Sequence, residues 1–270
     1  MTQDSTPFAA LALRFLLVAL GFLFIAIIFK EKNRSVDGLY HCCVTGLLFH
    51  GVYLGGVFYS VSVGFPAAIS ALIVCLQPIL TALAAGKLLD EVVSSRHWFG
   101  LILGLFGTTV VLTGETLSGL SNEGLIANGF ALIGITLGTL WQKRFSADIP
   151  IATNNGIQAL IACLFHFSLM WIFEVPVIEF TLSFSIALLW LTIAVSFGAF
   201  SILMYLIKHH SVSQIASLFY LVPPIAAIIG SVLLDEILSF LDIVGFFVSS
   251  LGVFLATRPN QAQDELPKSL

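Results

Sequence analysis

Charge is what this sequence has least of. Only 10% of its 270 residues are Asp, Glu, Lys or Arg, whereas a soluble globular chain carries roughly 25%. The hydrophobic fraction is 58%, so too few charged side chains remain to cover a surface that faces water. The composition therefore excludes an ordinary soluble domain and requires a surface that faces lipid.

Cysteines and catalytic motifs are also scarce. None of the four cysteines is placed for an extracellular disulfide, and apolar packing is the favoured role over lipidation of Cys42 or Cys43. The sequence has no HExxH motif, no carboxylate pair within an apolar run, and no Ser or Cys with an evident base. The pair His209-His210 at a helix end is a weak signal. We therefore expect no enzyme, no cofactor and no metal site.

Long apolar runs are abundant instead. A helix of about 20 apolar residues, rising 1.5 Å per residue, crosses a membrane core roughly 30 Å thick. Lipid cannot pair backbone polar groups, and the runs lack the alternation of a β-barrel strand, so helices are predicted. The prediction is an all-α polytopic membrane protein with nine spans: 8–29, 43–63, 66–87, 97–114, 125–142, 153–173, 184–207, 212–234 and 241–257.

The basic residues predict an orientation. Basic residues collect in cytoplasmic turns, and ten of the eleven Lys and Arg fall in alternate turns or the tail; Arg14 alone lies within a run. This pattern puts the C-terminus in the cytoplasm of a cell (inner) membrane protein and the N-terminus outside. Because such a start without a signal sequence is uncommon, we expect that an upstream helix is missing.

The tetrad "LLDE" occurs at 88–91 and again at 233–236. A shift of 145 positions aligns the two tetrads and also places Pro78 on Pro223 and Gly107 on Gly252. An internal duplication explains these matches. The basic residues put the first tetrad inside and the second outside, so the repeats are predicted to be inverted, as in many transporters. The acids of the tetrad are expected to cap or position the next helix at the water interface.

These residues resemble a known family. The stretches "ISALIVCLQPILTALAAGKLLDEVVSSRHWFGLILGLFGTTVVL" and "SQIASLFYLVPPIAAIIGSVLLDEILSFLDIVGFFVSSLGVFLA" are similar to EamA-type units of the drug/metabolite transporter superfamily. "PFAALALRF" is similar to the family's second helix and "GTLWQKRF" to the end of its sixth. The resemblance implies an inverted repeat of two five-helix units, with nine of ten helices present: 1–123, 124–258 and a polar cytoplasmic tail, 259–270.

Polar side chains on the apolar runs are the candidate lining of a substrate cavity. The prolines act either as static kinks or as hinges with freed carbonyls, and the other side chains either bind substrate or bond neighbouring helices. The resemblance adds the fifth run to the cavity walls. The candidates are His50, Tyr53, Ser70, Gln77, Pro78, Thr81, Thr136, Trp141, Ser201, Tyr205, Ser217, Tyr220 and Pro223.

The charges within the runs restrict the cargo. Arg14 is the one basic residue there, which argues against sugar phosphates; it could reach the outer headgroups, fix a neighbouring helix or bind substrate. His50 and His166 could carry protons, but single buried histidines are more often structural. Pairs such as Gly100 and Gly104 are expected to pack helices within the protein.

Together these features predict a secondary transporter, with export of a small neutral, zwitterionic or cationic metabolite as the favoured direction. The expected partners are that small molecule and the bilayer, with a homodimer left open and no nucleic acid. The alternatives are a membrane accessory or receptor protein without cargo and, less favoured, a membrane-embedded enzyme.

Overall fold

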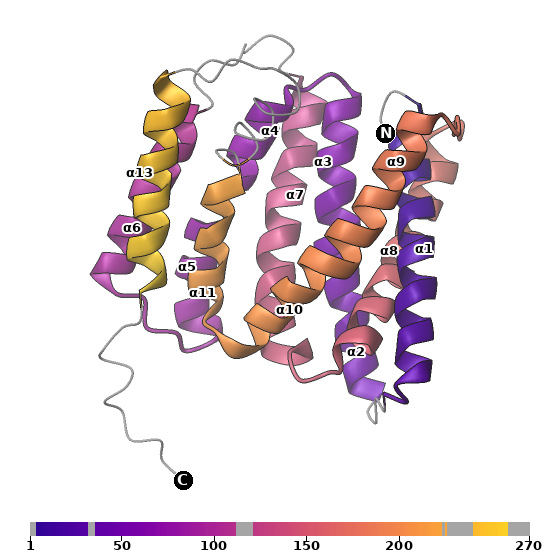
Figure 1. Ribbon diagram of the computed structural model, residues 1–270, viewed down its shortest axis with the longest axis horizontal. Helices are drawn as coiled ribbons and strands as arrows, with labels where there is room; N and C mark the ends of the chain where they lie inside the picture. The colour runs from indigo at the N-terminus through magenta and orange to yellow at the C-terminus, as the bar shows by residue number, and fades with distance from the viewer. Residues whose placement is uncertain (1–3, 32–35, 112–120, 223–224, 226–239, 259–270) are drawn as a thin grey trace. The chain divides into compact units, whose positions relative to one another are not determined.

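The computed structural model describes residues 4–31, 36–111, 121–222, 225 and 240–258 (Figure 1). The predicted all-α architecture is confirmed: within these residues the extended contact is one antiparallel bridge, between Ser5 and Ile178. The helical elements are α1 (Pro7–Ile28), α2 (Val36–Thr45), η1 (Gly46–Val52), α3 (Tyr53–Ser62), α4 (Ala67–Val74), α5 (Gln77–Leu88), α6 (Ser95–Val111), α7 (Asn122–Trp141), η3 (Gln142–Ser146), α8 (Ile151–Phe173), α9 (Leu182–Trp190), η4 (Leu191–Ala199), α10 (Phe200–His209), α11 (Val212–Ser217), η5 (Leu218–Leu221) and α13 (Phe240–Thr257).

Seven helical stretches of the described residues are long and apolar enough to cross a membrane: Pro7–Ile28, Val36–Ser62, Ile69–Leu88, Asn122–Ser146, Ile151–Phe173, Leu182–His209 and Phe240–Thr257. Each coincides with a predicted run. The fourth run forms α6, which has 17 residues. The eighth is described over Val212–Leu221. The second tetrad, Pro223 and the tail from 259 lie outside the described residues.

The chain folds into two compact units, and each takes segments from both sequence repeats. Unit 1 consists of Met1–Ser70 and Ser118–His210, and unit 2 of Ala71–Leu117 and Ser211–Leu270. The sequence repeats are therefore not the compact units of the fold.

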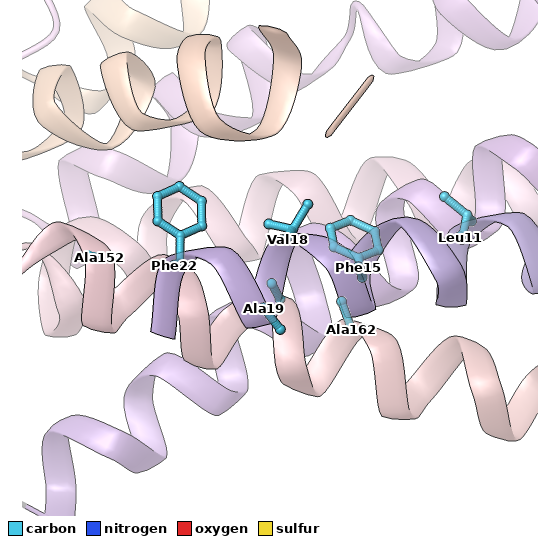
Figure 2. Packing of buried hydrophobic residues seen from close by; sticks show 8 residues of the cluster. Leu11, Phe15, Val18, Ala19, Phe22, Ala152 and Ala162 are labelled. Atoms are coloured by element: carbon cyan, nitrogen blue, oxygen red, sulfur yellow. The ribbon is translucent and has the colours of Figure 1, made fainter. Parts of the chain in front are cut away.

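In unit 1, α1 and α8 pack along their length in opposite directions (Figures 1 and 2). Shifting α1 by 145 residues gives 152–173, which is α8 within one residue, so the two helices are repeat equivalents. Alanines on α8 allow the larger side chains of α1 to approach closely. Their shared core consists of Leu11, Phe15, Val18, Ala19, Phe22, Ala152, Ala159 and Ala162.

In unit 2, the equivalent helices α6 and α13 also run antiparallel. The imidazole Nδ1 of His97, at the start of α6, lies 2.8 Å from the carbonyl of Ala256, at the end of α13. A Cβ atom on Gly107 would lie only 2.3 Å from the backbone nitrogen of Ser249. In both units, therefore, matched helices of the two repeats lie side by side and antiparallel, as an inverted repeat requires.

The third predicted run is one span but not one continuous helix. The helix is interrupted at Cys75 and Leu76, and Pro78 lies in the first turn of α5 rather than at the middle of a helix. Pro78 has no N–H to donate to the carbonyl of Val74, one turn earlier. In the second repeat, the 3₁₀ segment η5 follows α11 at the matched place. Both repeats thus change helix geometry just before their aligned prolines.

Candidate functional site

Arg14 lies deep in unit 1 and is 5% exposed. Its Nη2 donates a hydrogen bond of 3.0 Å to Ser196 Oγ, and its guanidinium lies 5.3 Å from the centre of the Phe15 ring. Its Nε has no partner among the described residues. The alternative in which Arg14 reaches the outer headgroups is therefore wrong, because the side chain points into the protein.

Two π-helical segments supply polar groups to the core of unit 1. The segment η1 carries His50, and η4 carries Thr192 and Ser196. Shifting η1 by 145 residues gives 191–197, which falls within η4, so the wider helix turn occurs at the same place in both repeats. Such segments are rare and are frequently found at functional sites. No residue pattern in the sequence indicates them.

His50 lies in an aromatic environment and is 7% exposed. Its ring centre is 5.1 Å from that of Phe15 and 4.3 Å from that of Phe200. Its Nδ1 has no partner among the described residues.

His166 of α8 is fully buried and also packs against Phe15. The two rings stack at 5.7 Å with an interplanar angle of 8°. A Cβ on Gly55 would lie 3.2 Å from His166 Nε2, so the glycine makes room for the imidazole. Arg14 lies close enough to His50 and His166 for its charge to act on both.

The other candidates of unit 1 do not converge on this cluster. Ser70 donates a hydrogen bond to the Asn128 side chain, which sequence reasoning missed, and Thr136 bonds within its own helix. Ser201 accepts a long hydrogen bond of 3.5 Å from Asn155. Tyr205 is 52% exposed.

Tyr53 and Trp141 occupy intermediate positions. Tyr53 packs edge-on against Phe49, with ring centres 6.2 Å apart. Trp141 packs against Phe145 at 4.6 Å, and its Nε1 has no partner among the described residues. Of these two, Tyr53 is near enough to Arg14 to act on its charge.

Unit 2 buries a second group of candidates. Gln77 is fully buried and donates a hydrogen bond of 3.0 Å to Thr81 Oγ1. Tyr220 is also fully buried, and its ring fills the space left by Gly104, where a Cβ would lie 2.5 Å from Cδ2. Ser217 bonds to the Gln214 carbonyl. The Gln77 carbonyl oxygen and the Tyr220 hydroxyl have no partner among the described residues.

Glutamates cap helices across the repeats. Glu91, from the first "LLDE", accepts hydrogen bonds from the backbone nitrogens of Val212 (2.7 Å) and Ser213 (3.2 Å) at the start of α11. It therefore caps a helix of the other repeat and not, as predicted, the next helix. Carboxylates stabilise helix N-termini through the unpaired N–H groups and the helix dipole.

Glu31 and Glu174 do the same in unit 1. Glu31 follows α1 and accepts from Thr153 N at 2.7 Å near the start of α8, whereas Glu174 follows α8 and accepts from Phe8 N at 3.0 Å near the start of α1. Each of the two equivalent helices is thus followed by a glutamate that caps the start of the other helix. Sequence reasoning missed both residues, although each is an acid directly after a long apolar run.

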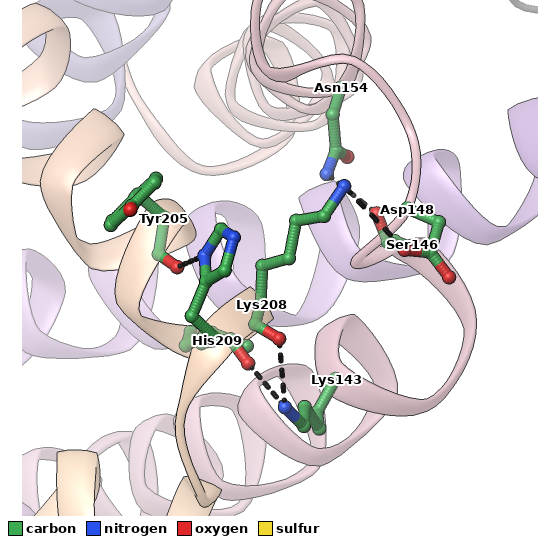
Figure 3. Close-up of polar contacts among 8 residues, drawn as sticks. Lys143, Ser146, Asp148, Asn154, Tyr205, Lys208 and His209 are labelled. Carbon is green, nitrogen blue, oxygen red and sulfur yellow. Dashed lines mark hydrogen bonds and ion pairs between the residues drawn. The ribbon is translucent and has the colours of Figure 1, made fainter.

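One end of unit 1 is closed by a polar network (Figure 3). Lys143 Nζ donates to the carbonyls of Ile207 (2.8 Å) and His210 (2.9 Å), which caps the C-terminus of α10. Lys208 forms an ion pair of 3.5 Å with the exposed carboxylate of Asp148. Tyr205 contributes only its carbonyl, which lies 2.8 Å from His209 Nδ1.

The side chains at these places can bind a polar molecule. In the described residues, no group of three His, Cys, Asp or Glu could hold a metal. The core of unit 1 offers a guanidinium, two imidazoles and hydroxyls among aromatic rings, which can hold a polar molecule.

The duplicated, antiparallel helices define a class: polytopic membrane proteins built from inverted repeats. Comparison identifies the family. The pattern of the EamA-like transporter family matches residues 1–113 and 124–258, and the chain belongs to this family. The resemblance predicted from the sequence is thereby confirmed.

Curated relatives of this chain are also named as transporters. The chain is 24% identical to the uncharacterized transporter YvbV of Bacillus subtilis, over 80% of this chain and 70% of that protein. It is 25% identical to the uncharacterized inner membrane transporter YedA of Escherichia coli K12, over 93% of this chain and 81% of that protein. A solved crystal structure superposes with a TM-score of 0.82 at 22% identity, covering 95% of this chain and 90% of that one, which supports the fold.

Proposed function

We propose that this transporter is a secondary carrier that exports a small neutral, zwitterionic or cationic metabolite by alternating access between its inverted repeats. The observation that carries the proposal is the antiparallel pairing of equivalent helices in both units, α1 with α8 and α6 with α13. Two related halves of opposite orientation can exchange conformations and open a site to either side in turn. Membership of a transporter family supports the same function.

The orientation follows from the basic residues. Lys30, Lys87, Lys143 and Lys208 lie at alternate helix ends. Because Lys and Arg prefer cytoplasmic turns, this pattern supports a cytoplasmic C-terminus in the cell membrane. The polar groups proposed to meet cargo in unit 2 are Gln77 and Tyr220, because both are buried with a polar atom that has no partner among the described residues.

Flux through proteoliposomes tests this proposal. A screen of amino acids, nucleosides and organic cations should identify a transported compound. Gln77→Ala and Tyr220→Phe should then lower the flux by about tenfold, since each removes a buried hydrogen-bonding group worth roughly 1–2 kcal/mol. Tyr40→Phe is the matched control, because Tyr40 is 60% exposed.

Unchanged flux in both variants would remove Gln77 and Tyr220 from the site. If the wild-type protein moves none of the compounds against empty liposomes, the carrier proposal fails and a cargo-free accessory protein is favoured.

A further inference from the structure

Arg14 is a buried positive charge without a matching negative one. Among the described residues, it is the one Lys or Arg that lies in a predicted span away from the span's ends, it is 5% exposed, and no carboxylate pairs with it. A buried, unpaired charge is costly in a membrane protein, and such residues usually mark a pathway or a binding site. Its one hydrogen bond given by the structure runs to a neutral hydroxyl, Ser196 Oγ.

Further polar atoms around Arg14 also have no partner in the described part of the chain. They are His50 Nδ1 and Thr192 Oγ1, which lies one turn before Ser196 in η4. Together with Arg14 of α1, these side chains come from three elements, α1, η1 and η4, and each is at least nine-tenths buried. Buried polar groups are nearly always hydrogen-bonded in proteins, so this concentration indicates a ligand.

The donors fit a carboxylate. A guanidinium presents a planar fork that binds both oxygens of a carboxylate, and an imidazole N–H or a hydroxyl can donate further hydrogen bonds. A single cation balances a single carboxylate. The phenyl rings of Phe15 and Phe200 lie 5.1 and 4.3 Å from the His50 ring and offer faces for the rest of the molecule, including an ammonium group.

We propose that Arg14 binds a carboxylate group of the cargo, with His50 and Thr192 as accessory donors. The cargo is then a small molecule with one carboxylate, and a zwitterion fits best because the aromatic rings can accept its ammonium group. This inference rests on the proposed transport function and, within its range of substrates, selects zwitterions that carry a carboxylate.

Ligand-dependent thermal stability of the purified full-length protein tests the site without requiring transport, because a ligand that binds the folded state raises the unfolding temperature. The probes are amino acids, 2-oxo acids and benzoate, each paired with its amide at equal ionic strength in sodium chloride. At least one carboxylate should stabilise the wild-type protein more than its amide. Arg14→Gln should weaken the binding of that carboxylate by about tenfold or more, as expected for the loss of a charge-assisted pair.

Arg144→Gln is the matched control, since it removes the same charge from an exposed helix end. It should keep the preference for the carboxylate. If Arg14→Gln does not fold, Arg14→Lys is the variant to test. It keeps the positive charge but loses the planar guanidinium fork. Its affinity for the carboxylate should therefore be measurably below that of the wild type, but higher than that of a neutral variant. Equal stabilisation by acid and amide, or full binding in Arg14→Gln or Arg14→Lys, would overturn the proposal.

Flux measurements separate this inference from the proposed function. If proteoliposomes transport amines or neutral compounds but no carboxylate, the carrier stands and the Arg14 site fails. If a carboxylate binds through Arg14 but no compound is transported, the site stands and the carrier fails.

Discussion

Glu91 joins two parts of the chain that are 121 residues apart in sequence. Its carboxylate accepts two backbone hydrogen bonds at the start of α11 and a third from the Ser213 hydroxyl at 2.8 Å. The neighbouring acid of the same tetrad, Asp90, is exposed and adopts a left-handed backbone with φ of 54°. The two acids therefore have different roles: Glu91 caps a helix, and Asp90 ends one.

Glu91→Gln should lower the free energy of unfolding by about 1–2 kcal/mol, because a neutral amide offers one acceptor oxygen and no charge to the helix N-terminus. Asp90→Asn is the control and should be nearly neutral, because Asn tolerates the left-handed conformation. Unfolding of the detergent-solubilised protein, followed by helical circular dichroism, measures both. Equal effects of the two variants would contradict the assigned cap.

At the scale of elements, glycines set how closely equivalent helices approach. Gly100 and Gly107 lie on α6. A Cβ on Gly100 would lie 2.6 Å from Ala256 N, and one on Gly107 would lie 2.3 Å from Ser249 N. Both neighbouring atoms belong to the backbone of α13, which cannot move aside as a side chain can. Gly129 on α7 has no atom within 4 Å of its Cβ position.

Gly107→Ala should destabilise the protein by about 1–3 kcal/mol, as overpacking does, because α6 and α13 must separate. Gly129→Ala should leave stability unchanged or raise it by up to about 1 kcal/mol through helix propensity. Thermal unfolding of the two variants in detergent gives the comparison. A stable Gly107→Ala protein would show that the helices are not packed as described.

The elements could be predicted only in part from the sequence. Apolar runs identify the spans, because length and hydropathy are local properties. The π-helical turn at His50 and the interruption at Cys75 could not be found, since both depend on neighbouring helices or on backbone geometry. The Glu31 and Glu174 caps were missed because their partners lie more than 100 residues away.

For the whole molecule, the duplicated "LLDE" and the alternating basic residues sufficed to predict an inverted repeat. The compact units were not predicted, because each combines helices from both repeats. Among the candidate site residues, the sequence favoured His50, Gln77 and Tyr220. The structure shows that all three are buried, as residues of a binding site can be. It gave Arg14 too little weight, because only the structure shows that its side chain points inward and lacks a carboxylate partner among the described residues.

The central claim is that the two repeats cross the membrane in opposite directions. Single cysteines at equivalent positions, Val92→Cys and Ile237→Cys, test it in a chain whose four native cysteines are replaced by alanine. A membrane-impermeant maleimide applied to intact cells should label the cysteine at 237 and reach the one at 92 only after permeabilisation. Labelling of both from the same side would contradict the inverted arrangement.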